Sequence, residues 1–228
     1  MSARDAILGR IRDNLQRGEL GTDAVEERLT RHEEGIRPER AQLPHAAQVD
    51  FFAAMAEEVD VSIARVSTIG DVPGAVADFL TAHNLPARLV AAPDERLETI
   101  PWAQKPTLEV RRGSAEESDA VSVTPALAGI AETGTIMAAS GPATPTTLNF
   151  LPENHVVVLR ESEVVGTYEE GWRRLREQSE GPGGETSMPR TVNFITGPSR
   201  TADIAMTLYL GAHGPRRLHI ILVSDDGE

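Results

Sequence analysis

Two short segments of the chain carry residue types that can bind or act on a small anion. The first is ITGPSRTADI, residues 195–204, in which an apolar run ends at a glycine and a proline. A helix that begins there would offer free backbone amides beside one guanidinium, and this combination favours an anion. The segment's hydroxyls can cap that helix, and a carboxylate in its first turn suits the positive end. The candidate anion-binding residues are Gly197, Ser199, Arg200, Thr201 and Asp203. A capped structural turn, with the arginine paired to an acid, is the alternative.

A histidine lies close behind this segment in GAHGPRRLH, residues 211–219. Small residues flank His213, so its ring would be free to face a cleft, although a loop histidine is often simply exposed to solvent. We include His213 among the ligand-binding candidates and expect Arg216 and Arg217 to be solvated.

The second segment is AGIAETGTIMAASGPATPTTLNFLPENH, residues 128–155. Glu132 stands directly before Thr133, Gly134 and Thr135, between a short expected helix and an apolar strand. A glutamate there can serve as a nucleophile, a general base or a hydrogen-bond anchor, and the three residues that follow can bind a ligand. The alternative is a loop carboxylate held by local amides or by an arginine. The SGPATPTT loop has no P-loop lysine and no GxGxxG pattern.

Composition excludes several classes of site and makes others poor candidates. The formal net charge is −13, which disfavours nucleic acid and anionic lipid as partners. The sequence contains no cysteine, so its own residues cannot form disulfides, thiolate zinc sites or cysteine-ligated iron–sulfur clusters. The six histidines lack HExxH spacing and no GxSxG elbow occurs, so we expect no metal site and no Ser/His/Asp hydrolase. No apolar run approaches the roughly 20 residues of a membrane span, and a cytoplasmic protein is expected.

Hydrophobic periodicity predicts alternating helices and strands after a charged amino-terminal part. Helical spacing is expected over residues 3–17, 22–33, 51–59, 73–83, 169–178 and 201–210, with one or two helical turns over 125–131. Strands are expected over residues 62–66, 87–92, 120–124, 135–139, 155–159, 191–196 and 218–223. This alternation predicts an α/β fold with a mainly parallel sheet flanked by helices. We expect an N-terminal helix and charged linker over residues 1–44 and one α/β domain over 45–228.

The two segments together resemble the LUD-domain family. The likeness rests on VTPALAGIAETGTIMAASG, LPENHVVVL and ITGPSRTADIAMTLYLGAHGPRRLHIILV, in this order, and covers residues 50–224 approximately. The start, AILGRIRDNL, is also similar to the start of that family. Either segment alone would be a weak signal, but the pair is specific. The chain is most similar to a member that lacks cysteine clusters.

The resemblance implies a fold and a role that spacing alone does not give. The fold would be the type shared by ribose-5-phosphate isomerases, CoA transferases and 5-formyltetrahydrofolate cyclo-ligases. The role would be the oxidation of L-lactate to pyruvate beside iron–sulfur partner proteins, with the clusters in those partners and no cofactor bound by this chain. In the CoA transferases a glutamate in a comparable loop attacks an acyl thioester, and Glu132 occupies a similar position.

Three functions therefore stay open at this stage. The first is a subunit of an L-lactate oxidation system, with a homo-oligomer possible. The second is a stand-alone enzyme on a small anionic or acyl substrate, with Glu132 as nucleophile or base. The third is a structural module whose glycines only shape turns. The enzyme hypothesis makes a spatial prediction, which is that Glu132 and Arg200 share the mouth of one cavity.

Overall fold

The computed structural model describes residues 3–15, 22–180, 187–202, 208–210 and 213–225. The chain divides into two compact units, Met1–Ile36 and Arg37–Glu228. The first unit contains the helices α1 (Ala3–Leu15) and α2 (Thr22–Arg31), in agreement with the helices expected there. The domain boundary expected after residue 44 stays a prediction.

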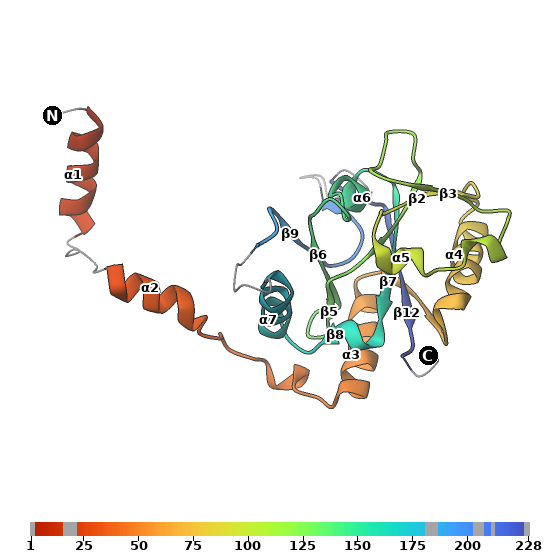
Figure 1. Ribbon diagram of the computed structural model, residues 1–228, viewed down its shortest axis with the longest axis horizontal. Coiled ribbons are helices and arrows are strands. Elements are labelled where there is room, and N and C mark those ends of the chain that lie inside the picture. Colours follow the sequence, from red (N-terminus) through yellow and green to blue (C-terminus); the bar gives the residue numbers. More distant parts are fainter. Residues whose placement is uncertain (1–2, 16–21, 181–186, 203–207, 211–212, 226–228) are drawn as a thin grey trace. The chain divides into compact units, whose positions relative to one another are not determined.

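The centre of the second unit is a six-stranded parallel sheet with the order β1-β12-β7-β4-β2-β3 (Figure 1). Its strands are β1 (Ser62–Val66), β2 (Arg88–Ala91), β3 (Glu109–Arg112), β4 (Val121–Pro125), β7 (Asn154–Arg160) and β12 (Arg217–Val223). The central strands read as near-continuous apolar runs because both faces of a parallel sheet are covered. The expected parallel α/β architecture is thus confirmed.

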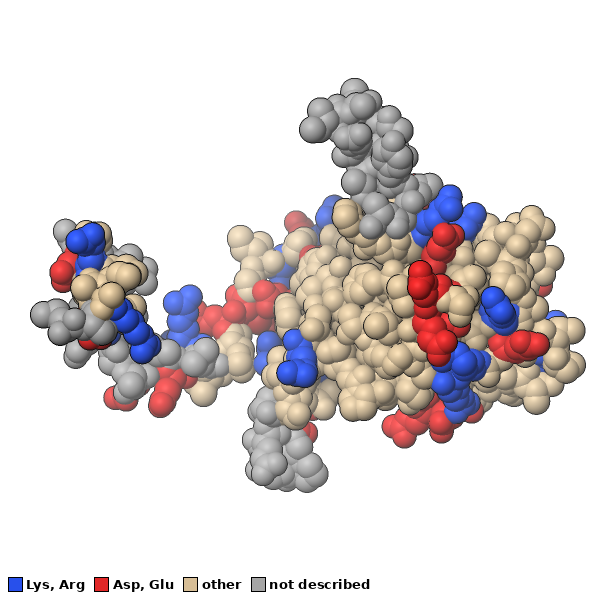
Figure 2. Space-filling model, turned by 90° about the horizontal axis from the view of Figure 1, so that it is seen from above, with Lys and Arg blue, Asp and Glu red and all other residues tan. Residues whose placement is uncertain are grey.

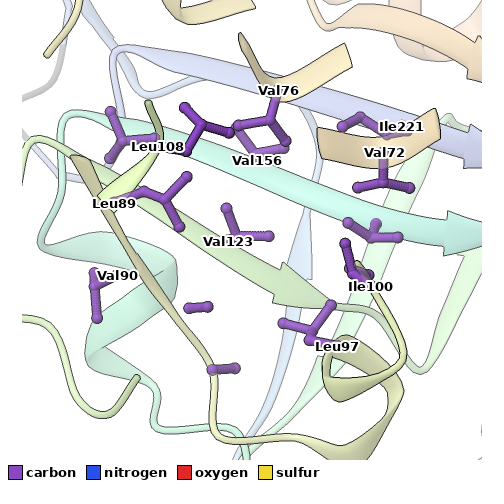
Figure 3. Close-up of a cluster of buried hydrophobic side chains, with 14 of the residues drawn as sticks. Val72, Val76, Leu89, Val90, Leu97, Ile100, Leu108, Val123, Val156 and Ile221 are labelled. Carbon is purple, nitrogen blue, oxygen red and sulfur yellow. The ribbon is translucent and has the colours of Figure 1, made fainter. Parts of the chain in front are cut away.

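A helix covers each face of this sheet. On one face α4 (Val72–Ala82) places Val72 and Val76 over Val123, Val156 and Ile221 of the strands, as Figure 3 shows. On the other face α3 (His45–Glu58) packs its buried side on β7 and β12. Alternate residues of one strand therefore enter two separate cores.

A second sheet of four strands has the order β8-β5-β6-β9. Its strands are β5 (Ala128–Ile130), β6 (Thr135–Ala139), β8 (Val164–Val165) and β9 (Val192–Ile195). One face contributes to the core around α3, and the other packs on α7 (Tyr168–Ser179), which lies beside this sheet in Figure 1. The division of the later strands between two sheets does not follow from the pattern of the sequence.

Short elements connect these layers. They are the helices α5 (Glu95–Glu98) and α6 (Thr147–Phe150) and the 3₁₀ turns η1 (Glu39–Ala41), η2 (Ile69–Asp71), η3 (Trp102–Gln104) and η4 (Glu161–Glu163). None of the helices within the described ranges has the length and apolar character that crossing a lipid bilayer requires.

The helical turns expected over residues 125–131 are wrong. Residues Ala128–Ile130 form β5, which pairs antiparallel with β6 and parallel with β8. All three residues of this strand are buried, so tertiary pairing on both edges outweighs the local preference.

The helix expected over residues 201–210 is also not found where the structure describes this part. Arg200–Ala202 is strand β10 and Leu208–Leu210 is strand β11, and the two pair antiparallel. A short run that is apolar on several faces suits a strand as well as a helix, and periodicity alone cannot separate them.

On the second unit, charged side chains of opposite sign lie side by side. On the face shown in Figure 2, Lys and Arg alternate with Asp and Glu along one band, with uncharged areas on either side. Ion pairs such as Arg112–Glu98, 2.7 Å apart, are of this kind. The negative net charge is therefore not spread as one uniform acidic surface.

Candidate functional site

Glu132 lies in the turn between β5 and β6, against the start of α7. Its backbone N–H donates to the Gly166 carbonyl at 3.0 Å, and its Oε1 accepts from the Tyr168 backbone N–H at 3.2 Å. The Arg40 guanidinium donates to its carbonyl oxygen at 3.0 Å. The residue is only 6% exposed, and its buried Oε2 has no hydrogen-bond partner among the described residues. A carboxylate in this position stabilises the positive end of a helix.

The helix start is built by local sequence. Thr167 is the N-cap of α7, its side chain accepts from the Glu170 backbone N–H, and Glu170 returns a bond in a capping box. The Glu170 carboxylate also accepts from the Gly166 backbone N–H at 2.7 Å. Two carboxylates, those of Glu132 and Glu170, therefore satisfy amides at one helix end.

Four hydroxyls meet beside Glu132. Thr135 Oγ1 lies 2.7 Å from Thr133 Oγ1, 3.1 Å from the Tyr168 hydroxyl and 2.7 Å from Thr196 Oγ1. Thr133 Oγ1 is 3.0 Å from the same Tyr168 hydroxyl. Because β6 pairs with β9 through Ile136 and Ile195, these hydroxyls join the two sequence segments. We call this group the hydroxyl cluster.

The two glycines of the segments let both turns approach the end of α3. Gly134 has φ +63°, and a Cβ there would lie 2.2 Å from the Ala56 backbone nitrogen. Gly197 has φ +82°, and a Cβ there would lie 2.6 Å from the Val59 carbonyl oxygen. Any larger residue would be strained and would collide with backbone, so both glycines are required by packing.

Arg200 lies elsewhere. It forms an ion pair with Asp60 and lines a cavity of about 300 Å³ at the amino ends of β1 and β12. Glu132 is not among the residues that line this cavity. The structure thus joins the two segments through the hydroxyl cluster. The Glu132 carboxylate, however, does not line the cavity beside Arg200.

The remaining candidates of the late segment hold the turn together. The Ser199 backbone N–H donates to the Pro215 carbonyl at 2.8 Å, and Ser199 Oγ accepts from the His213 backbone N–H at 3.1 Å. His213 is exposed. Thr201 belongs to β10 and pairs with Tyr209, but its side chain and all of Asp203 lie outside the described residues. No helix start occurs at Arg200 to carry the expected amide site.

The SGPATPTT loop lies beside a different cavity. Ser140, Gly141 and Thr146 line a space of about 790 Å³ together with Arg190 and residues of α7. Thr144 Oγ1 donates to the Ala139 carbonyl at 2.7 Å, which closes the loop on itself. Across the described part of the chain, no group of three or more His, Cys, Asp or Glu side chains could hold a metal ion.

Two buried histidines are not among the candidates expected from the sequence. His155 is fully buried, with Nε2 2.7 Å from Thr124 Oγ1, and burial lowers its pKa to about 4. His219 has Nδ1 2.8 Å from Ser62 Oγ and stacks on Phe79, and burial lowers its pKa to about 4 as well. Each directly precedes an apolar run, VVVL after His155 and IILV after His219, and these runs were the available signal.

Sequence comparison decides the family. The profile of the LUD domain matches residues 4–223, which is nearly the whole chain. The chain belongs to the LUD-domain family. The resemblance seen in the two segments is confirmed by this match.

Individual LUD-domain relatives cover smaller parts. Lactate utilization protein C of an Exiguobacterium species is 34% identical over 151 residues, which span 61% of this chain and 62% of that protein. Lactate utilization protein C of a Geobacillus species is 36% identical over 96 residues, which span 42% and 39%. The chain therefore matches less than two thirds of the length of these curated relatives.

A solved structure has a similar fold. The crystal structure of a DUF162 family protein from Deinococcus radiodurans superposes with a TM-score of 0.56 at 26% identity. The match covers 79% of this chain and 99% of that one. The likeness to the isomerase and CoA transferase fold stays a prediction.

Proposed function

We propose that this LUD-domain protein takes part in lactate utilization, as a cytoplasmic subunit of a system that oxidises L-lactate with iron–sulfur partner proteins. The observation that carries the proposal is the family match over residues 4–223, together with relatives named lactate utilization protein C. Those relatives are matched over only part of their length, so their activity is transferred here by inference.

Redox chemistry supports a system in which the iron–sulfur clusters belong to the partner proteins and not to this chain. Oxidation of L-lactate to pyruvate releases two electrons, which need an acceptor. This sequence contains no cysteine, so its residues supply no thiolate ligand for an iron–sulfur cluster. In the proposed system, partner proteins hold the clusters and this chain binds to them.

Deletion of the gene in the source organism tests this function. Growth on L-lactate as sole carbon source should fail, growth on glucose should be normal, and a plasmid copy of the full chain should restore lactate growth. Unimpaired lactate growth of the deletion strain, with no compensating paralogue in the genome, would reject the proposal.

A second candidate function rests on one observation. Glu132 Oε2 is buried without a partner among the described residues, so this carboxylate keeps an unused acceptor. A stand-alone enzyme on a small anionic or acyl substrate would use this oxygen as nucleophile or base. At 6% exposure, Glu132 would need the turn between β5 and β6 to open before a substrate could reach it.

Replacing Glu132 with Gln separates the two candidates. The enzyme candidate predicts that Glu132→Gln abolishes turnover while the fold is kept. The lactate proposal predicts that a folded Glu132→Gln chain still restores growth of the deletion strain. Full restoration by a folded variant would exclude Glu132 as a nucleophile in that pathway.

A further inference from the structure

Three arginines line one cavity, and they are Arg200, Arg216 and Arg217. Arg200 is the first residue of β10, Arg217 is the first residue of β12, and Arg216 directly precedes that strand. The hydrogen bond from the Ser199 N–H to the Pro215 carbonyl holds these two segments side by side. The cavity has a volume of about 300 Å³, and its arginines come from two segments that this hydrogen bond holds together.

Among the described residues, each of these arginines has a single side-chain partner. Arg200 pairs with Asp60, Arg216 lies 3.7 Å from Glu153, and Arg217 donates to the neutral Asn154 Oδ1 at 3.1 Å. Each guanidinium has five N–H donors, so single partners leave most of them available. Asp60 is the one carboxylate among the residues described as lining the cavity, and Glu153 pairs with Arg216, so three arginines meet two carboxylates. The charge there favours an anion.

A larger cavity adjoins this one. It has a volume of about 570 Å³ between β1 and α4, and Ser62 and His83 line both spaces. Ser62 Oγ is held 2.8 Å from His219 Nδ1, which fixes the side chain at the junction. A ligand that enters at the arginines can therefore extend toward α4.

The walls of the larger cavity have more apolar residues and more carboxylates than those of the smaller one. Ala75, Phe79 and Ala82 of α4 supply apolar wall, whereas Asp71 and Asp78 bring carboxylates and Arg65 is paired with Asp50. Two carboxylates would repel a second anionic group at that end. The two spaces together therefore suit a molecule with one anionic end and a neutral body.

We propose that this groove binds a small organic anion. Its carboxylate or phosphate lies among Arg200, Arg216 and Arg217, and its neutral part extends past Ser62 and His83 toward α4. Glu132 takes no part in this site, so the proposal stands or falls separately from the function proposed above.

Isothermal titration of the full-length protein tests the site with three probes. Inorganic phosphate supplies the anionic group alone, whereas phenyl phosphate and benzoate each carry it on an apolar ring. We expect at least one ring-bearing probe to bind at a 1:1 ratio and more tightly than inorganic phosphate. The stronger of the two identifies the anionic group that the site prefers.

Single substitutions test where the probes bind. Arg216→Gln and Arg200→Gln should each weaken the ring-bearing probe about tenfold or more. Arg111→Gln is the matched control, because Arg111 is similarly exposed and ion-paired but lies on β3 at the other edge of the sheet. Ala82→Leu, at an exposed position of the second cavity, should weaken the ring-bearing probe and leave inorganic phosphate unchanged.

Each other outcome overturns the proposal. Absence of binding by all three probes would exclude an anion site. Equal weakening by Arg111→Gln would show general attraction to surface arginines. Equal affinity for inorganic phosphate and both ring-bearing probes, unchanged by Ala82→Leu, would exclude the extended groove. Thermal unfolding of each variant shows that folded proteins are compared, and two independent arginine variants guard against the failure of one to fold.

Discussion

At the scale of single residues, Glu132 and Tyr168 join two turns that are far apart in the chain. The contact runs from a helix-end amide to a buried carboxylate, and the hydroxyl cluster lies next to it. A charged acceptor at a helix start is worth more than a neutral hydrogen bond, because both the bond and the helix dipole favour it. Glu132 thus anchors the start of α7, whatever further role it has.

Replacing Glu132 with Ala should therefore destabilise the fold. We expect the free energy of unfolding to fall by about 1–2 kcal/mol, because α7 loses an acceptor at its first turn. Urea denaturation followed by circular dichroism measures this. Glu117→Ala, at an exposed loop position, is the control and should change little. Equal stability of the Glu132→Ala variant and the parent would contradict the anchoring role.

Replacing either positive-φ glycine should lower the free energy of unfolding by more than Glu132→Ala does. Gly134→Ala and Gly197→Ala each combine a strained backbone with a Cβ that collides with α3 backbone, so we expect losses of about 3 kcal/mol or more. Gly74→Ala is the opposite case, because its Cβ would meet its nearest atom at 3.9 Å inside α4. That change should stabilise by about 0.5–1 kcal/mol. Urea denaturation followed by circular dichroism measures the stability of all three variants. Similar effects at all three positions would be inconsistent with the packing described.

Residue type predicted the kind of interaction that a side chain can make, but not which side chains lie next to one another. Arg200 was expected to share the mouth of one cavity with Glu132, which does not line the cavity beside Arg200. Arg216 is exposed, as expected, whereas Arg217 is half-buried. Which side chains meet depends on how the chain crosses between two sheets, and no local pattern encodes that crossing. The untested roles of Glu132, Arg200 and His213 remain predictions.

At the scale of elements, the parallel sheet buries two imidazoles at the amino ends of β7 and β12. Burial lowers the pKa of both His155 and His219 to about 4, from an ordinary value of 6.5. Between these values the unfolded chain binds protons that the folded chain does not. The sheet is therefore most stable above pH 6.5 and loses stability as the pH falls toward 4.

The pH dependence can be measured residue by residue. Each histidine should contribute a loss of up to about 3 kcal/mol in the free energy of unfolding between pH 6.5 and 4. His155→Gln and His219→Gln should each flatten this slope, even if the variant is less stable at every pH. His45→Gln, at an exposed position, should not. Carboxylates common to all variants cancel in the comparison. Parallel curves for all the variants would refute the assignment.

Elements were predictable where burial has a clear period. The strands at residues 62–66, 135–139 and 155–159 follow from apolar runs, and α4 and α7 follow from helical spacing. The strands β5 and β10 were not foreseen, because each is three residues long and depends on its partners for its shape. Short strands carry too few residues for periodicity to decide.

At the scale of the whole molecule, the chain consists of two units with different surfaces. In α1 the apolar residues Ile7, Leu8 and Ile11 are 61%, 38% and 48% exposed. The second unit has its own three buried clusters around the two sheets. Its stability should therefore come from its own core.

Removal of residues 1–36 tests this independence. We expect the shortened chain to unfold in one cooperative transition, with a melting temperature within a few degrees of the full chain. The double change Ile7→Gln and Ile11→Gln in the full chain should likewise leave the melting temperature unchanged. A drop of ten degrees or more in either protein would show that the first unit contributes to the core of the second.

The most direct test of the proposed function is reconstitution of L-lactate oxidation. Extract from the deletion strain grown with lactate present should reduce an artificial electron acceptor slowly when L-lactate is added, and purified full-length protein should restore the rate in proportion to its amount. D-lactate is the control substrate. Wild-type rates in the extract without this chain, unchanged by its addition, would contradict a role in lactate utilization.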